Sequence, residues 1–528
     1  MFANRFTTFK STLKPISLAV CLFSASAANA SNMEYLLDKL YKKGVLTERE
    51  YQEMKNMARE EWAASDAKDT TAAKAAKESA QAAKSNVVAR YKNGLTIESA
   101  DGQHAIGLTG RVHFDYRNNS NSFAQNFDRD TSSLADSFEL RRARIGLKGF
   151  VFKDISYEIV GNLVGSDTNT VDTAWINFGH FKPAQLRVGR SKQPFNLEEL
   201  TSSNNIDFIE RSYVNQLSPG KKHSIVLHGD PMKGLNYGVS MFQESFNEAT
   251  NETGDGKQYA ARIAMDVAQL AGMKDAVLHF GVAATTGKYD ITPATSSQTS
   301  SAASSTQTRG TIVGFRTDAR GLTNTYRAQL AGDALGTAAY SGLSNTVAEV
   351  DRELRGFEFA GAYGPFKLQT EWATSELDAR HRNTASFVTG EVKASYAEFI
   401  WNITGESWAA AYKSGAFGGI TPKSNFNMDG GRGAWQAGVR LSKYDASDIR
   451  VGTGTAAAGT AREQNSDQAK TLTVGVNWIL NPNTRVLFNY ARTKFNTPVT
   501  PIDVALLPGQ TNVGTDEKIF SIRTQLAF

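Results

Sequence analysis

The sequence predicts an all-β fold: a transmembrane antiparallel β-barrel of about 16 strands, preceded by an N-terminal α-helical or coiled-coil segment. The first observation is the end of the chain, where apolar and polar side chains alternate from Phe520 to Phe528. Because successive strand side chains point to opposite faces, this pattern gives a strand one apolar and one polar face. The second observation is that this period of two persists after Gly94. A secreted, soluble all-β protein is the competing interpretation.

The first 30 residues have the features of a secretory signal peptide. Arg5, Lys10 and Lys14 precede an apolar stretch from Ile16 to Phe23, and Ala28 to Ala30 is a small-residue cleavage site. The single cysteine lies in the apolar stretch, where a lipoprotein site is the weaker alternative because a large valine precedes it. After this signal, no run of roughly 18 apolar residues could form a membrane helix.

Residues 31–94 are predicted to be a helical segment of the periplasm, ahead of a barrel at 95–528. Two short helices are expected on either side of Gly44, and Thr47 to Glu50 has the pattern of a capping box. Beyond Trp62 the spacing of alanines from Ala73 to Val87 allows a thin coiled-coil seam. A solvated, half-ordered linker is the alternative, because the seam contains no Leu or Ile.

Sixteen strand-like segments follow, an even number, as closure of a bacterial barrel requires. They are residues 106–117, 138–149, 155–164, 171–179, 185–192, 222–229, 235–243, 258–267, 277–287, 356–364, 366–377, 388–404, 435–445, 470–480, 484–495 and 518–528. Tight turns such as Gly364-Pro365 alternate with longer links, which is typical of barrels with short periplasmic turns and long outer loops.

Segments 106–117 and 138–149 show how the two faces are assigned. Phe114 and Tyr116 are expected to face lipid, while Arg111 shares the opposite parity and faces the lumen. By the same rule Arg142 and Arg144 face the lumen. A charge on the lipid face at mid-membrane depth costs about 2 to 4 kcal/mol, so the parity fixes the direction in a barrel. In a soluble protein the same arginines would lie on a solvated sheet face.

The charges of the expected barrel cancel. Fifteen of the 58 basic residues and ten of the 53 acidic residues precede Leu95, so 43 of each remain in the rest of the chain. Binding of nucleic acid is therefore disfavoured. Any preference for anions must come from the local positions of the charges, because a narrow pore focuses the field locally.

One run of the expected barrel, residues 186–203 (LRVGRSKQPFNLEELTSS), matches a known pattern closely in order and spacing. With Ile209 to Ser212 and Leu217 to Lys221, it resembles the phosphate-selective outer-membrane porin family, the group of porins O and P. Further similar stretches are Phe138 to Phe150, Phe399 to Trp408, Val476 to Asn483 and Ile522 to Phe528. The resemblance covers residues 107–528.

The resemblance implies a homotrimer of sixteen-stranded barrels in the Gram-negative outer membrane, in contact with outer-membrane lipid. It also implies that the loop Ser191 to Pro219 folds into the pore and forms its narrowest part. The residues it places at the pore are Arg111, Arg142, Arg144 and Arg187 on the wall, and Lys192 and Arg211 projecting from the loop. Their donors would replace hydration around an inorganic anion such as phosphate.

The sequence also departs from the pattern of the phosphate-specific members, which have a dense ladder of alternating arginines. The stretch from His228 to Arg262 offers only Lys233, Lys257 and Arg262. The constriction loop also contains acidic residues, namely Glu198, Glu199, Asp207 and Glu210. A long later loop contains Arg309, Arg316, Arg320 and Arg327. A disordered, solvated loop is the favoured interpretation, and a supply of cations to the pore is the alternative.

Three functions stay open at this point: an anion-preferring channel, a general or cation-tolerant channel, and a non-channel barrel acting as a stalked surface adhesin. We expect no enzyme, because His113 and His279 have no identifiable Ser partner for a barrel hydrolase. We expect no metal and no cofactor, since the closest histidines, His223 and His228, fall on opposite strand faces.

Overall fold

A computed structural model describes two compact units, residues 1–86 and 87–528. The described residues are 30–60, 74, 87–91, 94–119, 136–164, 171–243, 256–291, 311–322, 325–330, 348–381, 386–452, 462–499 and 514–528. In this part of the chain no helix is both long enough and apolar enough to cross a membrane.

The N-terminal unit contains helix α1 (Ala30–Lys42) and a second helix at 48–60. The capping box is confirmed: the Thr47 N–H donates to the Glu50 carboxylate over 2.9 Å, and the Glu50 N–H donates to the Thr47 hydroxyl over 3.4 Å. The Thr47 hydroxyl and N–H hold the pKa of Glu50 below its ordinary value. The alanine-rich stretch with the predicted coiled-coil seam lies outside the described residues, apart from residue 74 and Val87.

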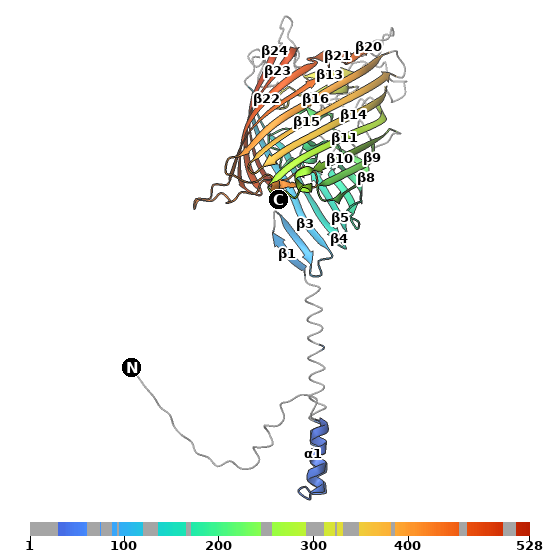
Figure 1. The fold of residues 1–528 in the computed structure, drawn as a ribbon, viewed down its shortest axis with the longest axis vertical. Helices are drawn as coiled ribbons and strands as arrows, with labels where there is room; N and C mark the ends of the chain where they lie inside the picture. The colour runs from blue at the N-terminus through green and yellow to red at the C-terminus, as the bar shows by residue number, and fades with distance from the viewer. Residues whose placement is uncertain are drawn as a thin grey trace, which may run out of the picture. The chain divides into compact units, whose positions relative to one another are not determined.

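The second unit is a closed antiparallel barrel of sixteen strands among the described residues, as predicted (Figure 1). The strands are β3 (Ala105–Asn119), β4 (Ser137–Val151), β5 (Ile155–Asn162), β6 (Val171–Phe178), β7 (Gln185–Lys192), β8 (Lys221–Met232), β9 (Leu235–Gln243), β10 (Lys257–Asp266), β11 (Ala276–Ile291), β14 (Ala348–Tyr363), β15 (Phe366–His381), β16 (Phe387–Asn402), β19 (Ala434–Asp445), β22 (Gln468–Asn481), β23 (Thr484–Val499) and β24 (Gly514–Ala527). Each strand pairs with the next, and β24 pairs with β3 to close the cylinder.

Tight turns join the strands mostly at one end of the barrel, here called the turn end, and longer links join them at the loop end. A hairpin of β1 (Val87–Tyr91) and β2 (Leu95–Ser99) adds to β3 at the turn end. Strand structure therefore begins at Val87, ahead of the expected boundary at residue 95. A short strand, β20 (Arg450–Gly452), extends the pairing of β16 at the loop end.

The two faces of the strands are as the parity predicts. On the outside, Phe114 is 45 % exposed and Leu526 is 44 % exposed, while on the inside Asp115 and Arg523 are fully buried. An apolar outer surface around a polar interior is the arrangement that a barrel in lipid requires.

Strand β4 departs from strict alternation at one position. His113 of β3 lies opposite Arg142, but the next residue, Phe114, lies opposite Leu140, so Arg141 is the extra residue of a β-bulge. The bulge turns two successive arginines inward. Arg141 Nε lies 2.9 Å from a Glu210 carboxylate oxygen, and Arg142 Nη1 lies 3.4 Å from His113 Nδ1. Without it, one of them would point into lipid, at a cost of about 2 to 4 kcal/mol at mid-membrane depth.

The loop between β7 and β8 lies against the inner wall, which confirms the expectation that it folds into the barrel. It contains the short helices α3 (Leu197–Leu200) and α4 (Tyr213–Leu217). Glu371 of β15 accepts the N–H groups of Leu197 and Glu198 at the start of α3, over 2.9 and 2.8 Å. On β23, Arg485 donates to the Ile206 carbonyl over 3.0 Å. The loop is therefore bonded to strands far apart around the barrel.

Buried ion pairs brace this loop. Glu210 lies 3.0 Å from Arg523 of β24, and Glu198 lies 3.3 Å from Arg440 of β19. The two arginine side chains are at most 3 % exposed. Because a buried carboxylate is costly without a partner, these pairs specify where the loop can lie.

Part of a long loop-end link also lies inside. Strands β12 (Thr311–Phe315), β13 (Tyr326–Gln329) and β21 (Arg462–Asn465) form a small sheet. The Phe315 ring stacks on Tyr444 with centroids 4.2 Å apart, and Tyr326 is fully buried. The interpretation of this link as a solvated loop is therefore wrong for its described part, which includes Arg316, Arg320 and Arg327. Arg309 lies outside the described residues.

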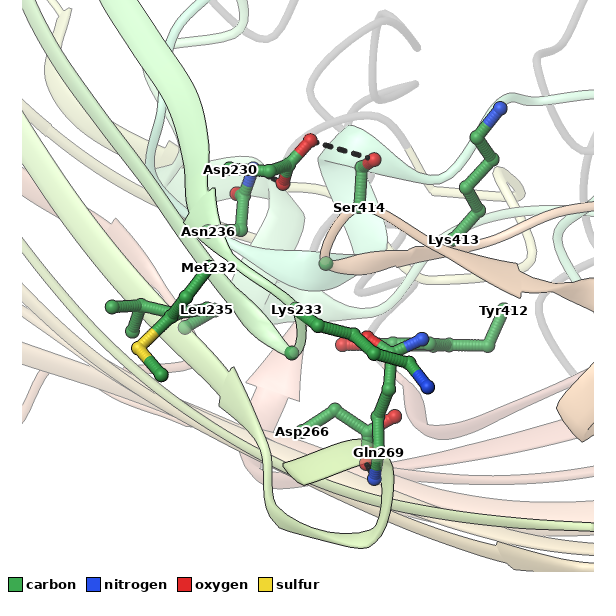
Figure 2. Close-up of a pocket in the computed structure, with 13 residues that line it drawn as sticks. Asp230, Met232, Lys233, Leu235, Asn236, Asp266, Gln269, Tyr412, Lys413 and Ser414 are labelled. Atoms are coloured by element: carbon green, nitrogen blue, oxygen red, sulfur yellow. Dashed lines mark hydrogen bonds between the residues drawn. The ribbon is translucent and has the colours of Figure 1, made fainter. Parts of the chain in front are cut away.

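The turn end has one long connection, residues 403–433 between β16 and β19. Its hairpin, β17 (Tyr412–Lys413) and β18 (Ala416–Phe417), covers the inner wall, where Arg262 of β10 donates to the Gly415 carbonyl over 3.0 Å. A pocket separates it from the β8–β9 turn and helix α5 (Val267–Leu270), and Figure 2 shows Ser414 and Asp230 pointing toward each other across it. Their hydrogen bond is 3.1 Å long.

Lys367 of β15 is a further wall cation that pairs with the inner loop, and it provides a test of how buried ion pairs hold that loop in place. Its ammonium lies 2.5 Å from Asp207 of the inner loop and 3.3 Å from Glu398, and its side chain is 2 % exposed. Lys367→Met leaves two buried carboxylates without their common cation, so we expect a loss of about 3 to 5 kcal/mol in the free energy of unfolding. Urea titration in detergent micelles measures this loss.

The matched control is Lys288→Met on the outer surface, where the side chain is 62 % exposed. Exposed pairs contribute about 0 to 1 kcal/mol, so this variant should unfold like the parent protein. Equal stability of the two variants would contradict the bracing role of Lys367.

Candidate functional site

The inner wall has a covered part and an accessible part. On β14 and β15 the inward-facing Glu358 and Glu371 are each 1 % exposed, because the inner loop, the small sheet and the β17–β18 hairpin lie over strands β10 to β24. On β5 to β7 the inward-facing Glu158, Trp175 and Arg187 are only half-buried. The solvent-accessible inner surface therefore follows the strands from β4 to β8.

Asp172, at the start of β6, is the centre of a charge cluster on this accessible wall. Arg144 Nη2 lies 2.9 Å from Asp172 Oδ1, and Lys221 Nζ bonds to the other carboxylate oxygen. Arg111 lies opposite Arg144 in the β3–β4 register and donates to the Ser203 hydroxyl over 2.7 Å. Among the described residues no carboxylate forms an ion pair with Arg111. This part of the cluster therefore has more cations than anions.

Two more cations approach from the inner loop and its entry. Arg211 Nη1 lies 3.4 Å from Glu199, and Lys192 Nζ lies 3.9 Å from the same carboxylate. Both side chains also donate to the Thr201 carbonyl, over 2.8 and 3.1 Å. A cation suits the C-terminal end of a helix such as α3. Lys192 and Arg211 therefore hold the end of α3 rather than projecting freely from the loop as expected, although they stay 23 % and 14 % exposed.

The remaining two predicted residues lie on either side of this cluster. Arg142 is buried beside His113, and the Arg187 guanidinium lies 4.5 Å from the Trp175 ring centroid, in cation–π contact. Neither has an ion-paired carboxylate in the described part of the chain.

The described residues of the cluster give an excess of positive charge. Three acidic residues of the inner loop add no unpaired negative charge to this cluster. Glu198, Asp207 and Glu210 each pair with a cation on the covered part of the wall. The accessible cluster consists of five cations and two carboxylates, namely Arg111, Arg144, Lys192, Arg211, Lys221, Asp172 and Glu199. Such a surface attracts small anions and offers several hydrogen-bond donors for them.

Sequence reasoning did not select Asp172 or Lys221. Both lie at strand ends, where a side chain's direction does not follow from parity. Lys221 is part of the sequence run that resembles the porin family, and this was the available signal for it.

Comparison with known proteins gives the family. The family described as phosphate-selective porin O and P matches residues 106–528. The chain belongs to this family. Porin O of Pseudomonas aeruginosa is 27 % identical over 423 residues, which cover 78 % of this chain and 87 % of that protein.

Two solved structures are also similar in fold. An anion-selective porin from Comamonas acidovorans is 12 % identical with a TM-score of 0.42, covering 80 % of this chain and 100 % of that chain. The outer membrane channel DcaP of Acinetobacter baumannii is 11 % identical with a TM-score of 0.42, covering 80 % of this chain and 97 % of that chain.

With the family and the closed barrel established, this porin is an outer-membrane channel of a Gram-negative bacterium. Its apolar outer belt contacts outer-membrane lipid. The turn end then faces the periplasm and the loop end faces the outside, as the lengths of the connections indicate.

The cluster predicts the effect of removing its central carboxylate. Asp172→Asn leaves Arg144 and Lys221 without their anion, so the ratio of anion to cation permeability should rise. A unit charge ~6 Å from a passing ion in water contributes ~0.7 kcal/mol, and salt at ~0.1 M roughly halves this energy. Because the anion and the cation respond with opposite sign, the ratio should change about threefold. Reversal potentials in a salt gradient across a planar bilayer measure it. Asp230→Asn in the turn-end pocket is the control, and an equal shift for both variants would contradict a special role for Asp172.

Proposed function

We propose that this porin conducts small hydrophilic solutes with a preference for anions, and that inorganic phosphate is among them. The observation that supports the proposal is the accessible cluster of five cations against two carboxylates, beside the loop that narrows the barrel. No catalytic step is needed for this activity, and the family match favours a channel over an enzyme.

An anion that enters a narrow passage loses part of its hydration shell. The guanidinium groups of Arg111 and Arg144 and the ammonium of Lys221 offer donors at fixed positions, which compensate for the lost hydrogen bonds. The negative charge of Asp172 weakens this attraction. Moderate binding suits conduction, because the ion must also leave the site.

The six residues selected from the sequence have different roles in this proposal. Arg111 and Arg144 contact the passing anion, while Lys192 and Arg211 contribute positive charge from the end of α3. Arg187 presents its guanidinium on the periplasmic side of the cluster, where it is stacked on Trp175. Arg142 is too buried for direct contact and adds to the field behind the wall.

Phosphate selectivity is the finer part of the proposal. The family description and the similarity to Porin O support it, whereas the sparse arginines between His228 and Arg262 argue for a weaker preference than a dense ladder would give. A homotrimer, as the resemblance implies, is part of the same proposal. A general, cation-tolerant channel is the second candidate, favoured by Asp172, Glu199 and Glu158 on the accessible wall.

Selectivity measurements distinguish these candidates. For the variant with Arg111→Gln and Arg144→Gln together, we expect the ratio of anion to cation permeability to fall about tenfold, since two charges at the passage are lost. Zero-current potentials of single channels in a KCl gradient give the ratio. The control variant removes two cations from the outer surface, Lys288→Gln and Arg355→Gln.

The control should keep the parent ratio. A parent protein that prefers cations, or a double variant with unchanged selectivity, would refute the proposal. Absence of unitary conductance in the parent protein would favour a surface adhesin instead.

Phosphate itself tests the finer claim. If phosphate binds at the cluster, millimolar phosphate should reduce the chloride current of the parent protein, and this block should weaken in Arg111→Gln. Conductance in constant chloride with rising phosphate measures it, with sulfate as the matched anion. Equal block by sulfate and phosphate would leave an anion channel without phosphate selectivity.

A further inference from the structure

The outer surface of four neighbouring strands changes abruptly from apolar to basic near the loop end. The apolar belt ends with Leu441 on β19, Leu472 on β22, Tyr490 on β23 and Phe520 on β24, which are 38 to 62 % exposed. Two residues further toward the loop end on the same outward faces are the basic residues Lys443, Lys470, Arg492 and Lys518. Lys494 follows one outward position beyond Arg492.

These cations are aligned across the strands. Lys443 lies directly opposite Lys470, and Lys470 lies directly opposite Lys494. Arg492 in turn lies opposite Lys518. Like charges in register on one face of a sheet repel each other, so the row destabilises the isolated barrel.

Internal ion pairs neutralise only part of the patch. Asp516 lies 3.0 Å from Arg492 and 3.7 Å from Lys518. Lys443, Lys470 and Lys494 are exposed, and among the described residues they form no ion pair. Asp516 lies opposite Lys494 in the register, so the three aligned lysines are partly balanced and keep an excess of positive charge toward the surroundings of the barrel.

Cations on the outer face of nearby strands do not share this feature. On β16, next to β19, Lys393 lies 3.0 Å from Glu391 and 3.2 Å from Asp448. On β14, Arg355 lies 3.0 Å from Glu353 and 3.9 Å from Glu376 of β15. On β11, Lys288 lies 3.5 Å from Glu349. The cations of β11 to β15 are thus balanced by nearby carboxylates. The aligned lysines of β19, β22 and β23 therefore differ from these balanced cations.

The position of the patch indicates the chemistry of its partner. A side chain just beyond the apolar belt lies at the level of lipid headgroups, and the loop end lies at the outer leaflet. In the Gram-negative outer membrane this leaflet consists of a glycolipid with phosphate groups near its acyl chains. We propose that Lys443, Lys470, Arg492, Lys494 and Lys518 form a binding site for the phosphate groups of this outer-leaflet glycolipid.

Charge complementarity favours this occupant over others. In the proposed homotrimer the subunits join through unlike surfaces, so a subunit contact at this patch would need an acidic face on the neighbouring copy, and the outward residues of the four strands are mostly basic here. Phosphate destined for the channel enters through the lumen, whereas these side chains point outward from the barrel. The glycolipid combines acyl chains that fit the apolar belt with phosphates that fit the basic row.

Direct binding measurements test the site. The variant Lys443→Gln, Lys470→Gln, Lys494→Gln removes the aligned row, and the matched control Lys288→Gln, Arg355→Gln, Arg380→Gln removes three cations that have carboxylate neighbours. The probe is purified lipopolysaccharide titrated onto the full-length protein in zwitterionic detergent. The dephosphorylated glycolipid and inorganic phosphate serve as further arms.

Each lysine near an anionic lipid surface contributes about fivefold in affinity, so the patch variant should bind lipopolysaccharide about 100-fold more weakly than the parent. The control variant should lose far less affinity for lipopolysaccharide. A second triple variant replaces the same lysines by arginine: Lys443→Arg, Lys470→Arg, Lys494→Arg. It should retain lipopolysaccharide binding, which would show that the fold tolerates changes at these positions. Normal single-channel conductance of the glutamine variant verifies that it folds.

Four outcomes would overturn the proposal. Equal losses in the patch and control variants would indicate a general charge effect, and equal affinity for the dephosphorylated glycolipid would exclude phosphate recognition. A changed oligomeric state with unchanged lipopolysaccharide binding would identify the patch as a subunit contact. If millimolar inorganic phosphate competes with lipopolysaccharide, the site recognises phosphate groups, as proposed. If excess lipopolysaccharide fails to displace bound inorganic phosphate, the assignment to lipid is overturned.

Discussion

The inner loop between β7 and β8 depends on buried ion pairs that hold it against one side of the barrel. Glu198, Asp207 and Glu210 each meet a cation of the wall, on β19, β15 and β24 respectively. A carboxylate buried without such a partner costs several kcal/mol, so the loop has few alternative positions. Because it is held on that side, the accessible inner surface is left along β4 to β8. The position of the passage is thus a consequence of where the pairs form.

The same residue types therefore have two roles in this lumen. Arg440 and Arg523 are buried and neutralised, and they position the backbone. Arg111 and Arg144 are half-buried and take part in a cluster with excess positive charge. A barrel with 43 basic and 43 acidic residues after residue 94 can still favour anions, because Glu198, Asp207 and Glu210 pair with covered cations and leave the accessible cluster with an excess of positive charge. Net charge does not determine selectivity, whereas the distribution of pairs does.

The strands could be predicted from the sequence because period two is a local property, and each of the sixteen expected segments overlaps a strand of the barrel. The inward direction of Arg111 and Arg144 follows from the same rule. The bulge at Arg141 could not be predicted, since Arg141 pairs with Glu210, which lies 69 residues further along the chain. The burial of Phe315 was missed for a similar reason: it packs on Tyr444, and a polar link gives no local sign of so distant a contact.

These limits explain why the candidate site was only partly predicted. Parity determines which face a side chain occupies, but it does not determine whether another segment covers that face. Lys192 and Arg211 illustrate the difference, because their ammonium and guanidinium groups donate to carbonyls at the end of α3. They still add two positive charges to the accessible wall, at positions fixed by the loop backbone. In the proposed anion passage their contribution is therefore electrostatic rather than one of free, mobile donors, and such fixed charge would attract an ion without binding it so tightly that it cannot leave.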